Sequence, residues 1–415
     1  MGQRKESGDR VIDSKIKVLM VISQFYPIIG GAERQADLLA KTLCKKGIQV
    51  SIATGWWNFG TPHREIDSGI RIVRNFSCWR MFGIKGLRTL GVFFYAISLG
   101  IYLLMHRKEY DIIHVHQVLY PAFITAFIGK GLLKKPVLAK MACSGLTSDI
   151  KNIGRFPLGN LQLKYLLKKL DSLVVMNREG GEEFQRLGYP PSRIEHIPNG
   201  VIFSAERKNQ RDETPTVITA VRLDKQKGID ILLKAWSNVV DHEPEVKLFV
   251  LGKGPSETEF KQLSQSLGIV DSVVFTGEVK DVEEHLRNSD IFVLASRAEG
   301  MSNALLEAMS YGLVCIATSI NGNVELIAEE TRSEISAGEF LVTRNGILVN
   351  PEDVDALSKA ILFLVRNPEA REALGRNARD TIKKNYCIDL IADRYIELYR
   401  HVLRGGKECA ESVVS

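Results

Sequence analysis

The sequence predicts an α/β protein built around two doubly wound parallel sheets. Short, nearly continuous apolar runs rich in Val and Ile alternate with longer segments whose apolar residues recur at helical spacing. Parallel strands that are buried on both faces have this composition. The alternation stops once in the middle of the chain and then restarts. Because 415 residues are more than one hydrophobic core usually serves, two domains are expected.

The first domain begins with a predicted strand at residues 15–23, followed by a turn and a helix that closes at Gly47. Glycine commonly ends helices, and a strand after the helix completes a strand–helix–strand unit of the kind that forms parallel sheets. The further elements expected in this domain are strands at 48–54, 69–75, 110–116, 135–142 and 171–177 and helices at 89–105 and 159–169.

Residues 198–215 lose the alternation, are mostly polar and have proline at both ends. We therefore place the domain boundary there and expect one domain over 15–200 and a second over 214–387. An amphipathic helix at about 388–405 would then be able to pack back on the first domain. The elements expected after the boundary are strands at 216–223, 246–252, 272–278, 290–296 and 313–318 and helices at 228–240, 258–268, 282–289 and from about 303 onward.

Two such Rossmann-like domains that face one another leave a cleft between them. Ligands of doubly wound sheets bind at the carboxyl ends of the strands, so the cleft is where chemistry is expected.

The charges divide unevenly between the halves. Residues 1–200 hold 29 Lys and Arg against 15 Asp and Glu, a net charge of +14, whereas residues 201–415 hold 26 against 34, a net charge of −8. One interpretation is that solubility charges differ by chance. The other is that the first domain faces an anionic membrane or a phospholipid-linked acceptor. Nucleic acid is not expected as a partner, because no basic segment interleaved with aromatic residues and no known binding motif is present.

The six cysteines have no paired spacing, and the first residues are polar and charged, so no signal peptide is expected. These features predict a cytoplasmic protein, with peripheral contact at the inner membrane face as a further option. Residues 89–105 are 17 uncharged residues between Arg88 and Arg107, at the lower limit of transmembrane length. We interpret them as a buried core helix rather than a span. The alternative is a helix in a membrane interface, preceded by the basic aromatic segment 79–88.

Two sites in the first domain attract attention. Gly30 and Gly31 precede a predicted helix, where backbone N–H groups can approach a phosphate, although a glycine pair before a helix is also an ordinary turn. His114 and His116 lie two apart on a strand and hence on the same side of the sheet. No nearby carboxylate or cysteine completes a metal site. His116, nearer the end of its strand, is the candidate for substrate contact, and His114 is expected to be packed and hydrogen-bonded.

In the second domain, Arg222 and Lys227 follow the first strand on a loop before a helix. Two fixed cations at a strand end suit a diphosphate, because Arg makes two-pronged hydrogen bonds and Lys supplies a point charge. A solvated basic turn is the alternative interpretation.

The segment "EGMSNALLE" places Glu299 just after a predicted buried strand and Glu307 inside the next helix. Ser302 or Asn303 is the predicted N-cap, and the N–H groups near Gly300–Asn303 would favour an anion. Glu307 can accept both hydroxyls of a ribose, and Glu299 hydroxyls of another ring. Alternatively, Glu307 only complements the helix dipole and Glu299 lies in solvent.

This Glu-x7-Glu segment resembles the signature of the retaining GT-B glycosyltransferases of family 4. The resemblance extends over about residues 16–400, since further segments agree with the family in order: "GGAER", "DIIHVH", "IPNGV", "RLDKQKG", "VLGKGP", "VVFTGEV" and "NGILVNPEDVDAL".

The resemblance implies an enzyme that moves a sugar from a nucleoside-diphosphate sugar to a glycan or lipid-linked acceptor, with retention and without an agreed protein nucleophile. UDP-sugars are expected ahead of GDP-mannose, and polysaccharide or glycoconjugate synthesis is the expected setting. The resemblance also implies roles for the candidate residues. Arg222 and Lys227 would bind the donor diphosphate, Gly30 and Gly31 would approach it from the other domain, and Glu307 would bind the ribose. Glu299 and His116 would contact the transferred sugar, and Met301, Ser302 and Asn303, beside Gly300, would contact the sugar or a phosphate.

Enzymes of this fold usually need no metal. Asp353 and Asp355 form an Asp-x-Asp pair, but the pair opens a predicted helix away from the other motifs, so we interpret it as capping. Two rival functions remain: a nucleotide-sugar epimerase, which needs no acceptor, and a catalytically silent protein that binds nucleotide sugars.

Overall fold

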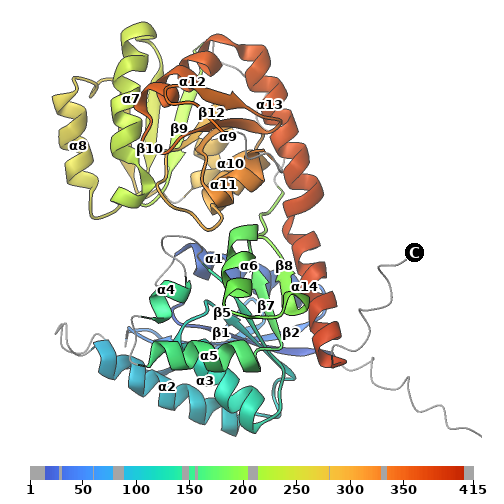
Figure 1. Ribbon diagram of the computed structural model, residues 1–415. Coiled ribbons are helices and arrows are strands. Elements are labelled where there is room, and N and C mark those ends of the chain that lie inside the picture. The colour runs from blue at the N-terminus through green and yellow to red at the C-terminus, as the bar shows by residue number, and fades with distance from the viewer. Residues whose placement is uncertain are drawn as a thin grey trace, which may run out of the picture.

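The computed structural model describes residues 15–27, 30–58, 60–77, 88–142, 149–154, 158–203, 214–279, 281–328 and 334–405. These residues form two halves, each built around one mostly parallel sheet, and the half formed by the later part of the chain lies uppermost in Figure 1. The predicted α/β class with two parallel sheets is confirmed.

The first sheet has eight strands in the order β3-β4-β2-β1-β5-β6-β7-β8. All neighbours pair in parallel except β3 and β4. The edge strands β3 and β8 were not predicted, because both are short, have no fully buried residue and lack an apolar run. The strands are β1 (Lys17–Ile22), β2 (Gln49–Trp56), β3 (Arg64–Asp67), β4 (Ile70–Phe76), β5 (Ile112–His116), β6 (Val137–Lys140), β7 (Ser172–Val175) and β8 (Ile194–His196).

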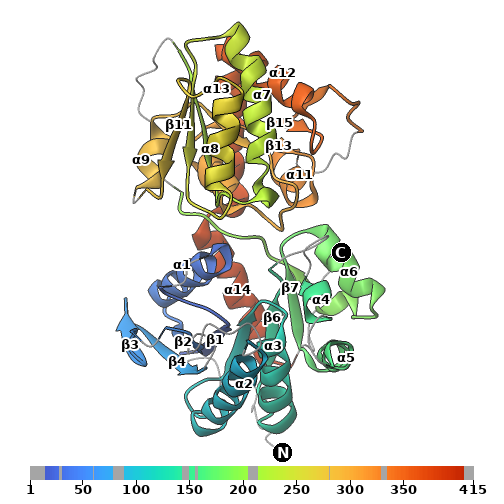
Figure 2. The same ribbon diagram turned by 90° about the vertical axis from the view of Figure 1, so that its left-hand side faces the viewer.

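Helices cover both faces of this sheet (Figures 1 and 2). On one face, α1 (Gly31–Lys45) and α14 (Ile388–Leu403) share a core with β1 and β2. On the other lie α2 (Arg88–Met105), α3 (Tyr120–Thr125), the π-helical η2 (Ala126–Leu132) and α5 (Gly159–Lys169). Three shorter segments, α4 (Asp149–Ile153), α6 (Arg178–Arg186) and η4 (Pro191–Arg193), complete this half.

Helix α2 is only partly the buried helix that the sequence predicts. Tyr95, Leu99 and Leu103 on one face are fully buried. On the opposite face, Phe93 and Ile101 remain 58% and 51% exposed. Within the described part of the chain, no helix combines the length and apolar character needed to cross a membrane.

The second sheet has seven strands in the order β11-β10-β9-β12-β13-β15-β14, of which only β14 runs antiparallel to its neighbour. Its strands are β9 (Thr216–Ala220), β10 (Lys247–Leu251), β11 (Val273–Gly277), β12 (Ile291–Leu294), β13 (Val314–Thr318), β14 (Phe340–Val342) and β15 (Gly346–Val349). Its helices are η5 (Lys225–Lys227), α7 (Ile229–His242), α8 (Glu257–Ser266), α9 (Val282–Arg287), α10 (Asn303–Ser310), α11 (Asn321–Ile327), α12 (Val354–Arg366), α13 (Pro368–Thr381) and η6 (Ile382–Tyr386).

The chain passes between the halves twice, and the two crossings lie side by side. The Val201 N–H donates to the Tyr386 carbonyl at 2.9 Å, and the Ile388 N–H donates to the Val201 carbonyl at 2.9 Å. A Cβ on Gly200 would lie 2.9 Å from Cα of Ile388, so a larger residue would force the two crossings apart. After the second crossing, α14 buries Tyr395 and Tyr399 in the core of the first half.

Candidate functional site

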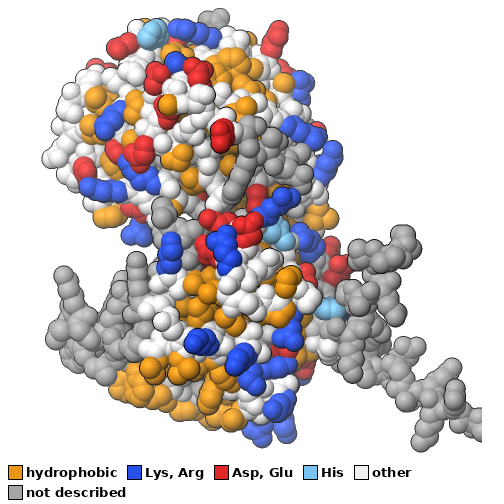
Figure 3. Space-filling model, in the orientation of Figure 1, with side chains coloured by type: hydrophobic (Ala, Val, Ile, Leu, Met, Phe, Trp, Pro, Cys, Tyr) orange, Lys and Arg blue, Asp and Glu red, His pale blue; other side chains and the backbone are white. Residues whose placement is uncertain are grey.

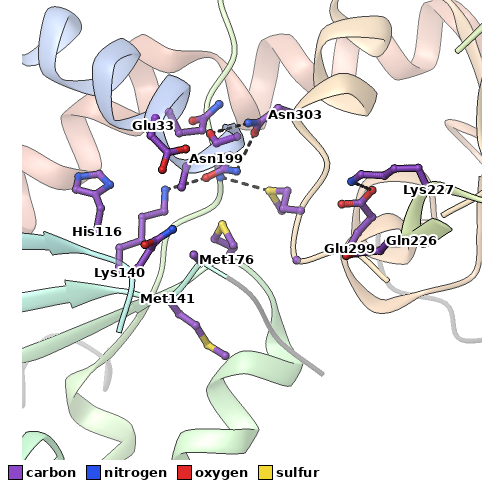
Figure 4. A pocket seen from close by; sticks show the side chains of 17 residues that line it. Glu33, His116, Lys140, Met141, Met176, Asn199, Gln226, Lys227, Glu299 and Asn303 are labelled. Carbon is purple, nitrogen blue, oxygen red and sulfur yellow. Dashed lines mark hydrogen bonds and ion pairs between the residues drawn. The ribbon is translucent and has the colours of Figure 1, made fainter. Parts of the chain in front are cut away.

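A pocket of about 290 Å³ opens between the two halves, where the carboxyl ends of strands from both sheets meet. The first half supplies a wall that includes His116 and Lys140, and the second half a wall that includes Lys227 and Glu299 (Figure 4). Asn199, on the first crossing, lies between the two walls. The expected cleft at the strand ends is therefore present.

Most of the residues predicted for the site line this pocket. Seven of the eleven do so: Gly31, His116, Lys227, Glu299, Gly300, Met301 and Asn303. The other four, which are Gly30, Arg222, Ser302 and Glu307, are not among its lining residues.

The wall from the second half is built on β12 and the start of α10. Glu299 follows β12, and its Oε1 accepts hydrogen bonds from Lys227 Nζ at 2.7 Å and from Ser296 Oγ at 2.8 Å. As predicted, Ser302 is the N-cap of α10, and its Oγ accepts from the Leu305 N–H at 3.3 Å. The arrangement presents a cation, a carboxylate and a helix N-terminus within one pocket, which is the composition expected for a phosphorylated sugar.

Lys227 reaches Glu299 because the loop before α7 approaches β12 closely. Gly228 has φ 64°, in the left-handed region, and a Cβ there would lie 1.9 Å from the carbonyl oxygen of Ala295. Glycine meets both demands, since it has no Cβ. The Gln226 side chain adds a hydrogen bond to the Ala298 carbonyl at 2.8 Å.

Arg297 also holds this loop, and sequence reasoning missed it. Its guanidinium donates two hydrogen bonds to Asp230 at the start of α7, at 2.9 and 2.8 Å, and pairs with Glu352. Burial raises the pKa of Asp230, but the Arg297 hydrogen bonds and charge outweigh it, so that the pKa lies below its usual value. The sequence offers no signal for this pair, because the partners are 67 residues apart.

Two of the four predicted residues outside the pocket lining, Glu307 and Arg222, have other partners. Glu307, one turn inside α10, faces Arg34 of α1 across the interface, with 3.6 Å between Oε1 and Nη2. Burial raises the pKa of Glu307, and the Arg34 charge opposes the increase. The Arg222 side chain is 72% exposed, with its Nε 3.7 Å from Asp224. Arg222 is therefore not positioned at the pocket in this structure.

The wall from the first half is built on β5 and β6. The rings of His114 and His116 stack with centroids 4.3 Å apart. A hydrogen bond of 2.8 Å joins His114 Nδ1 to the Tyr399 hydroxyl of α14, so His114 is the packed, hydrogen-bonded histidine that was predicted. His116 is buried against the pocket, and its Nε2 has no hydrogen-bond partner among the described residues. Burial and then the charge of Lys140 lower the pKa of His116 to about 3.

Sequence reasoning also missed Lys140, Asn199 and Glu33. Lys140 Nζ donates to Asn199 Oδ1 at 2.8 Å, and Asn199 Nδ2 donates to Asn303 Oδ1 at 2.9 Å. Asn303 Nδ2 in turn donates to the Gly31 carbonyl at 3.0 Å. Lys140 ends β6 as His116 ends β5, so the rule that singled out His116 also applied to it. Lys140 was overlooked because it lies within the apolar segment 137–142.

Glu33 lies in the first turn of α1 and lines the pocket. Burial raises its pKa, and backbone hydrogen bonds at Glu33 and Gly30 oppose the increase. Its Oε2 lies 2.6 Å from where a Cβ of Gly30 would be, so a carboxylate already occupies the entrance of this helix. The expected approach of Gly30 and Gly31 to a phosphate stays a prediction.

Asp353 has a structural role. It is the N-cap of α12, and its Oδ1 accepts from the Ala356 N–H at 2.9 Å, as predicted. Asp355 pairs with Lys359, with 3.1 Å between Oδ2 and Nζ. Among the residues that the structure describes, no group of three or more His, Cys, Asp and Glu is arranged to hold a metal ion.

Comparison with known proteins identifies the family. Residues 29–204 match the family described as Glycosyltransferase Family 4, and residues 202–381 match Glycosyl transferases group 1. A relative in Bacillus anthracis, the N-acetyl-alpha-D-glucosaminyl L-malate synthase, is 25% identical over 92% of this chain and 97% of its own. The UDP-Gal:alpha-D-GlcNAc-diphosphoundecaprenol alpha-1,3-galactosyltransferase of Escherichia coli is 25% identical over 93% of this chain and 98% of its own.

The fold has close counterparts among solved structures. The sucrose-phosphate synthase of Thermosynechococcus elongatus superposes with a TM-score of 0.74 at 20% identity, over 94% of this chain and 100% of that one. Its similarity supports the GT-B arrangement of two facing domains. The two family matches together extend from residue 29 to residue 381. This chain therefore belongs to the group 1 glycosyltransferases of family 4 and is a glycosyltransferase of the GT-B fold.

Proposed function

We propose that this enzyme transfers a sugar with retention from a nucleoside-diphosphate sugar, a UDP-sugar ahead of a GDP-sugar, to a glycan or lipid-linked acceptor. In this proposal residues 15–200 form the acceptor-side domain, with α14 packed on it, and residues 214–387 form the nucleotide-sugar-binding domain. The observation that carries it is the pocket itself, which places Lys227, Glu299 and the N-terminus of α10 opposite His116. The name of the Escherichia coli relative contains a UDP-sugar donor, which also favours UDP.

The chemistry follows from the charges around the pocket. As the bond between the sugar and the diphosphate breaks, negative charge grows on the departing oxygen, and Lys227 with the N–H groups at the start of α10 would stabilise it. Glu299 already accepts two hydrogen bonds at Oε1, so Oε2 is the oxygen best placed for a sugar hydroxyl. The acceptor hydroxyl would attack from the face that the diphosphate leaves, and its proton would pass to the departing diphosphate. No protein nucleophile is needed.

One experiment separates this proposal from its rivals. The protein is first screened by thermal shift against UDP-glucose, UDP-galactose, UDP-N-acetylglucosamine and GDP-mannose, because a bound ligand raises the unfolding temperature as its concentration exceeds its Kd. The stabilising sugar nucleotide, labelled in the sugar, is then incubated with a membrane or glycan extract and without it.

We expect nucleotide release and a labelled acceptor only when the extract is present. An epimerised sugar formed without extract would instead identify an epimerase. Binding without nucleotide release in every extract would identify a silent binding protein, and either result would overturn the transferase proposal.

We also propose that the acceptor is reached at an anionic membrane surface, at the inner face. Helices α2, α5 and η2 contain no acidic residue, and Figure 3 shows apolar side chains gathered over the part of the first half where α2 lies, with basic side chains beside them. The exposed apolar residues of these helices are Phe93, Phe94, Ile97, Ile101, Leu104, Met105, Phe127, Leu132 and Leu161. Nearby exposed cations are Arg107, Lys108, Lys134, Lys164, Lys168 and Lys169.

This surface is continuous across the helices. The Phe127 ring of η2 lies 5.9 Å from the Tyr165 ring of α5, and a Cβ on Gly100 of α2 would lie 2.7 Å from Ile128 of η2. Apolar side chains surrounded by cations are the composition that binds the interface of an anionic bilayer. The name of the Escherichia coli relative contains a lipid diphosphate acceptor, which fits such a location.

A further inference from the structure

Lys140 is a buried cation without a counter-ion. It is only 6% exposed, and its Nζ makes one hydrogen bond, to Asn199 Oδ1 at 2.8 Å. The Tyr395 ring lies beneath the ammonium, with its centroid at 5.8 Å. Within the described ranges of the chain, no carboxylate lies within 4.0 Å of it. An ammonium has three donors, and a buried charge without a partner is unfavourable, so Lys140 lacks acceptors that its position demands.

In the described part of the chain, His116, which lies beside Lys140, also lacks a hydrogen-bond partner at one ring nitrogen. His116 and Lys140 are register partners on the parallel strands β5 and β6, so their side chains leave the same face of the sheet at neighbouring positions. Both line the pocket, and Nε2 of His116 is buried without a hydrogen-bond partner among the described residues. The two strand ends therefore present two unsatisfied polar groups to one place in the pocket.

The position of the pair separates it from the expected diphosphate site. Figure 4 shows Lys140 and His116 on one side of the pocket and Lys227 with Glu299 on the other, with Asn199 and Asn303 between them. Lys227 is neutralised by Glu299 at 2.7 Å, whereas Lys140 has no such partner. The pocket thus has a second basic site, on the wall that belongs to the first half.

We propose that Lys140, with His116 beside it, binds an anionic oxygen of the substrate, either a carboxylate or a phosphate. A negatively charged oxygen at this place would accept hydrogen bonds from Nζ and from Nε2–H of His116. It would also supply the charge that the buried ammonium lacks, and charge-assisted hydrogen bonds of this kind are the strong ones. The proposal rests on the assignment of this pocket as the sugar-transfer site and adds a substrate feature to it.

Binding measurements on the full chain test it with three variants, Lys140→Met, Lys140→Gln and Lys135→Met. Lys140→Gln keeps a donor for Asn199 without the charge, and it decides the test if Lys140→Met fails to fold. Lys135→Met is the matched control, because Lys135 also lies 5.8 Å over a tyrosine ring, that of Tyr110, but does not line the pocket. Calorimetric titration at pH 6.5 uses UDP, UDP-glucose and UDP-glucuronic acid, and then inorganic phosphate and malonate added to the UDP-saturated protein.

We expect at least one of these probes to bind both Lys140 variants about tenfold or more weakly than the parent and Lys135→Met. An equal loss for UDP itself would place Lys140 at the donor diphosphate and overturn the proposal of a second anion site. A loss confined to UDP-glucuronic acid assigns it to a carboxylate on the transferred sugar, and a loss confined to phosphate or malonate assigns it to the acceptor.

Equal affinity of parent and Lys140 variants for all five probes would overturn the proposal. If the parent binds no nucleotide at all, the proposed donor class fails, while phosphate and malonate, titrated then without UDP, still decide whether Lys140 binds an anion. Failure of the function and failure of this site are therefore distinguishable.

Discussion

At the scale of single residues, the two carboxylates of the Glu-x7-Glu segment have different surroundings. Glu299 is held by Lys227 and Ser296 inside the pocket. Glu307 lies outside the pocket lining and has Arg34 at 3.6 Å as its ion-pair partner. A donor that placed its ribose at Glu307 would have to compete with Arg34 or bind beside it. Removal of each acid should therefore affect a different property of the enzyme, donor affinity for Glu307 and turnover for Glu299.

We expect Glu307→Ala to weaken UDP binding about tenfold or more, because a hydrogen bond to a charged group contributes about 1.5–3 kcal/mol. Glu299→Ala should leave UDP affinity within a few-fold of the parent and lower the turnover number instead, since Glu299 is assigned to the transferred sugar. Calorimetry with UDP and the rate of nucleotide release measure the two effects. The control is Glu339→Ala, an exposed glutamate near Lys359. If both cleft variants bind UDP as tightly as the parent, the ribose assignment is wrong.

Lys140 predicts a pH dependence of stability. Burial lowers its pKa from 10.5 to about 7, so between about pH 7 and pH 10.5 the unfolded chain holds a proton that the folded chain has lost. Stability from this group therefore rises with pH across that window, and below pH 7 the full penalty of a buried charge is present. His116 and His114, which face Lys140 from β5, have lowered pKa values and stay neutral throughout the window.

Lys140→Met should accordingly unfold at higher urea concentration than the parent at pH 6, and its advantage should shrink steadily between pH 7 and pH 10. Lys135→Met should show no such trend. An advantage of Lys140→Met that is the same at pH 6 and pH 10 would contradict a buried, titrating ammonium.

At the scale of elements, the loop between β9 and α7 depends on one glycine. Gly228 has φ 64°, so any other residue there would have a strained backbone, and its Cβ would lie only 1.9 Å from the Ala295 carbonyl oxygen. Gly268 offers a matched control, because it has φ 69° but no atom within 4 Å of its Cβ position. Both sites carry the backbone cost of a left-handed residue, which is about 1–2 kcal/mol. Only Gly228 carries the clash as well.

Gly228→Ala should therefore lower the free energy of unfolding clearly more than Gly268→Ala does, as measured by urea denaturation. It should also weaken UDP binding, because the loop carries Lys227 toward Glu299, whereas Gly268→Ala should leave UDP binding unchanged. Equal losses of stability at the two positions would show that the approach to Ala295 does not constrain the loop.

Most elements could be predicted from the sequence, because buried parallel strands and amphipathic helices leave strong patterns. The exceptions are informative. β3, β8 and β14 are edge strands of three or four residues, exposed or only partly buried, and too short to give a clear pattern. Further elements, among them β15, α11 and α13, were also not predicted, although β15 is fully buried. Helix α2 was assigned to the core because residues 89–105 carry no charge, and a segment without charged residues does not show which of its faces is exposed.

The site was predictable where one rule applied, namely that ligands meet strand ends and helix starts. This rule found His116, Lys227 and Glu299. It did not reveal the chain of hydrogen bonds from Lys140 through Asn199 to Asn303, because these contacts arise only where the two halves meet. The periodicity of apolar residues within one half does not show which residues lie at the interface between the halves.

At the scale of the whole molecule, the two halves are joined by hydrogen bonds at the pocket. Asn177 Nδ2 donates to the Gly300 carbonyl at 2.7 Å, and Asn303 Nδ2 donates to the Gly31 carbonyl at 3.0 Å. The start of α10, which we propose binds the donor, is thus hydrogen-bonded to the first half. With the donor site proposed above, donor binding would be coupled to the relative position of the halves through these residues.

The proposed contact of α2 with a membrane leads to a prediction for the whole chain. The parent should co-sediment with vesicles of phosphatidylglycerol and bind far less to vesicles of phosphatidylcholine, because the cations beside α2 attract only the anionic surface. The double variant Phe93→Ser/Ile101→Ser should lose most of this binding, since burying one such side chain contributes about 1.5–3 kcal/mol. Val270→Ser/Val274→Ser is the control, because these valines are also exposed but belong to the second half. All three proteins should bind UDP equally. Co-sedimentation of the α2 variant at the level of the parent, or no binding of the parent to anionic vesicles, would exclude α2 as the membrane contact.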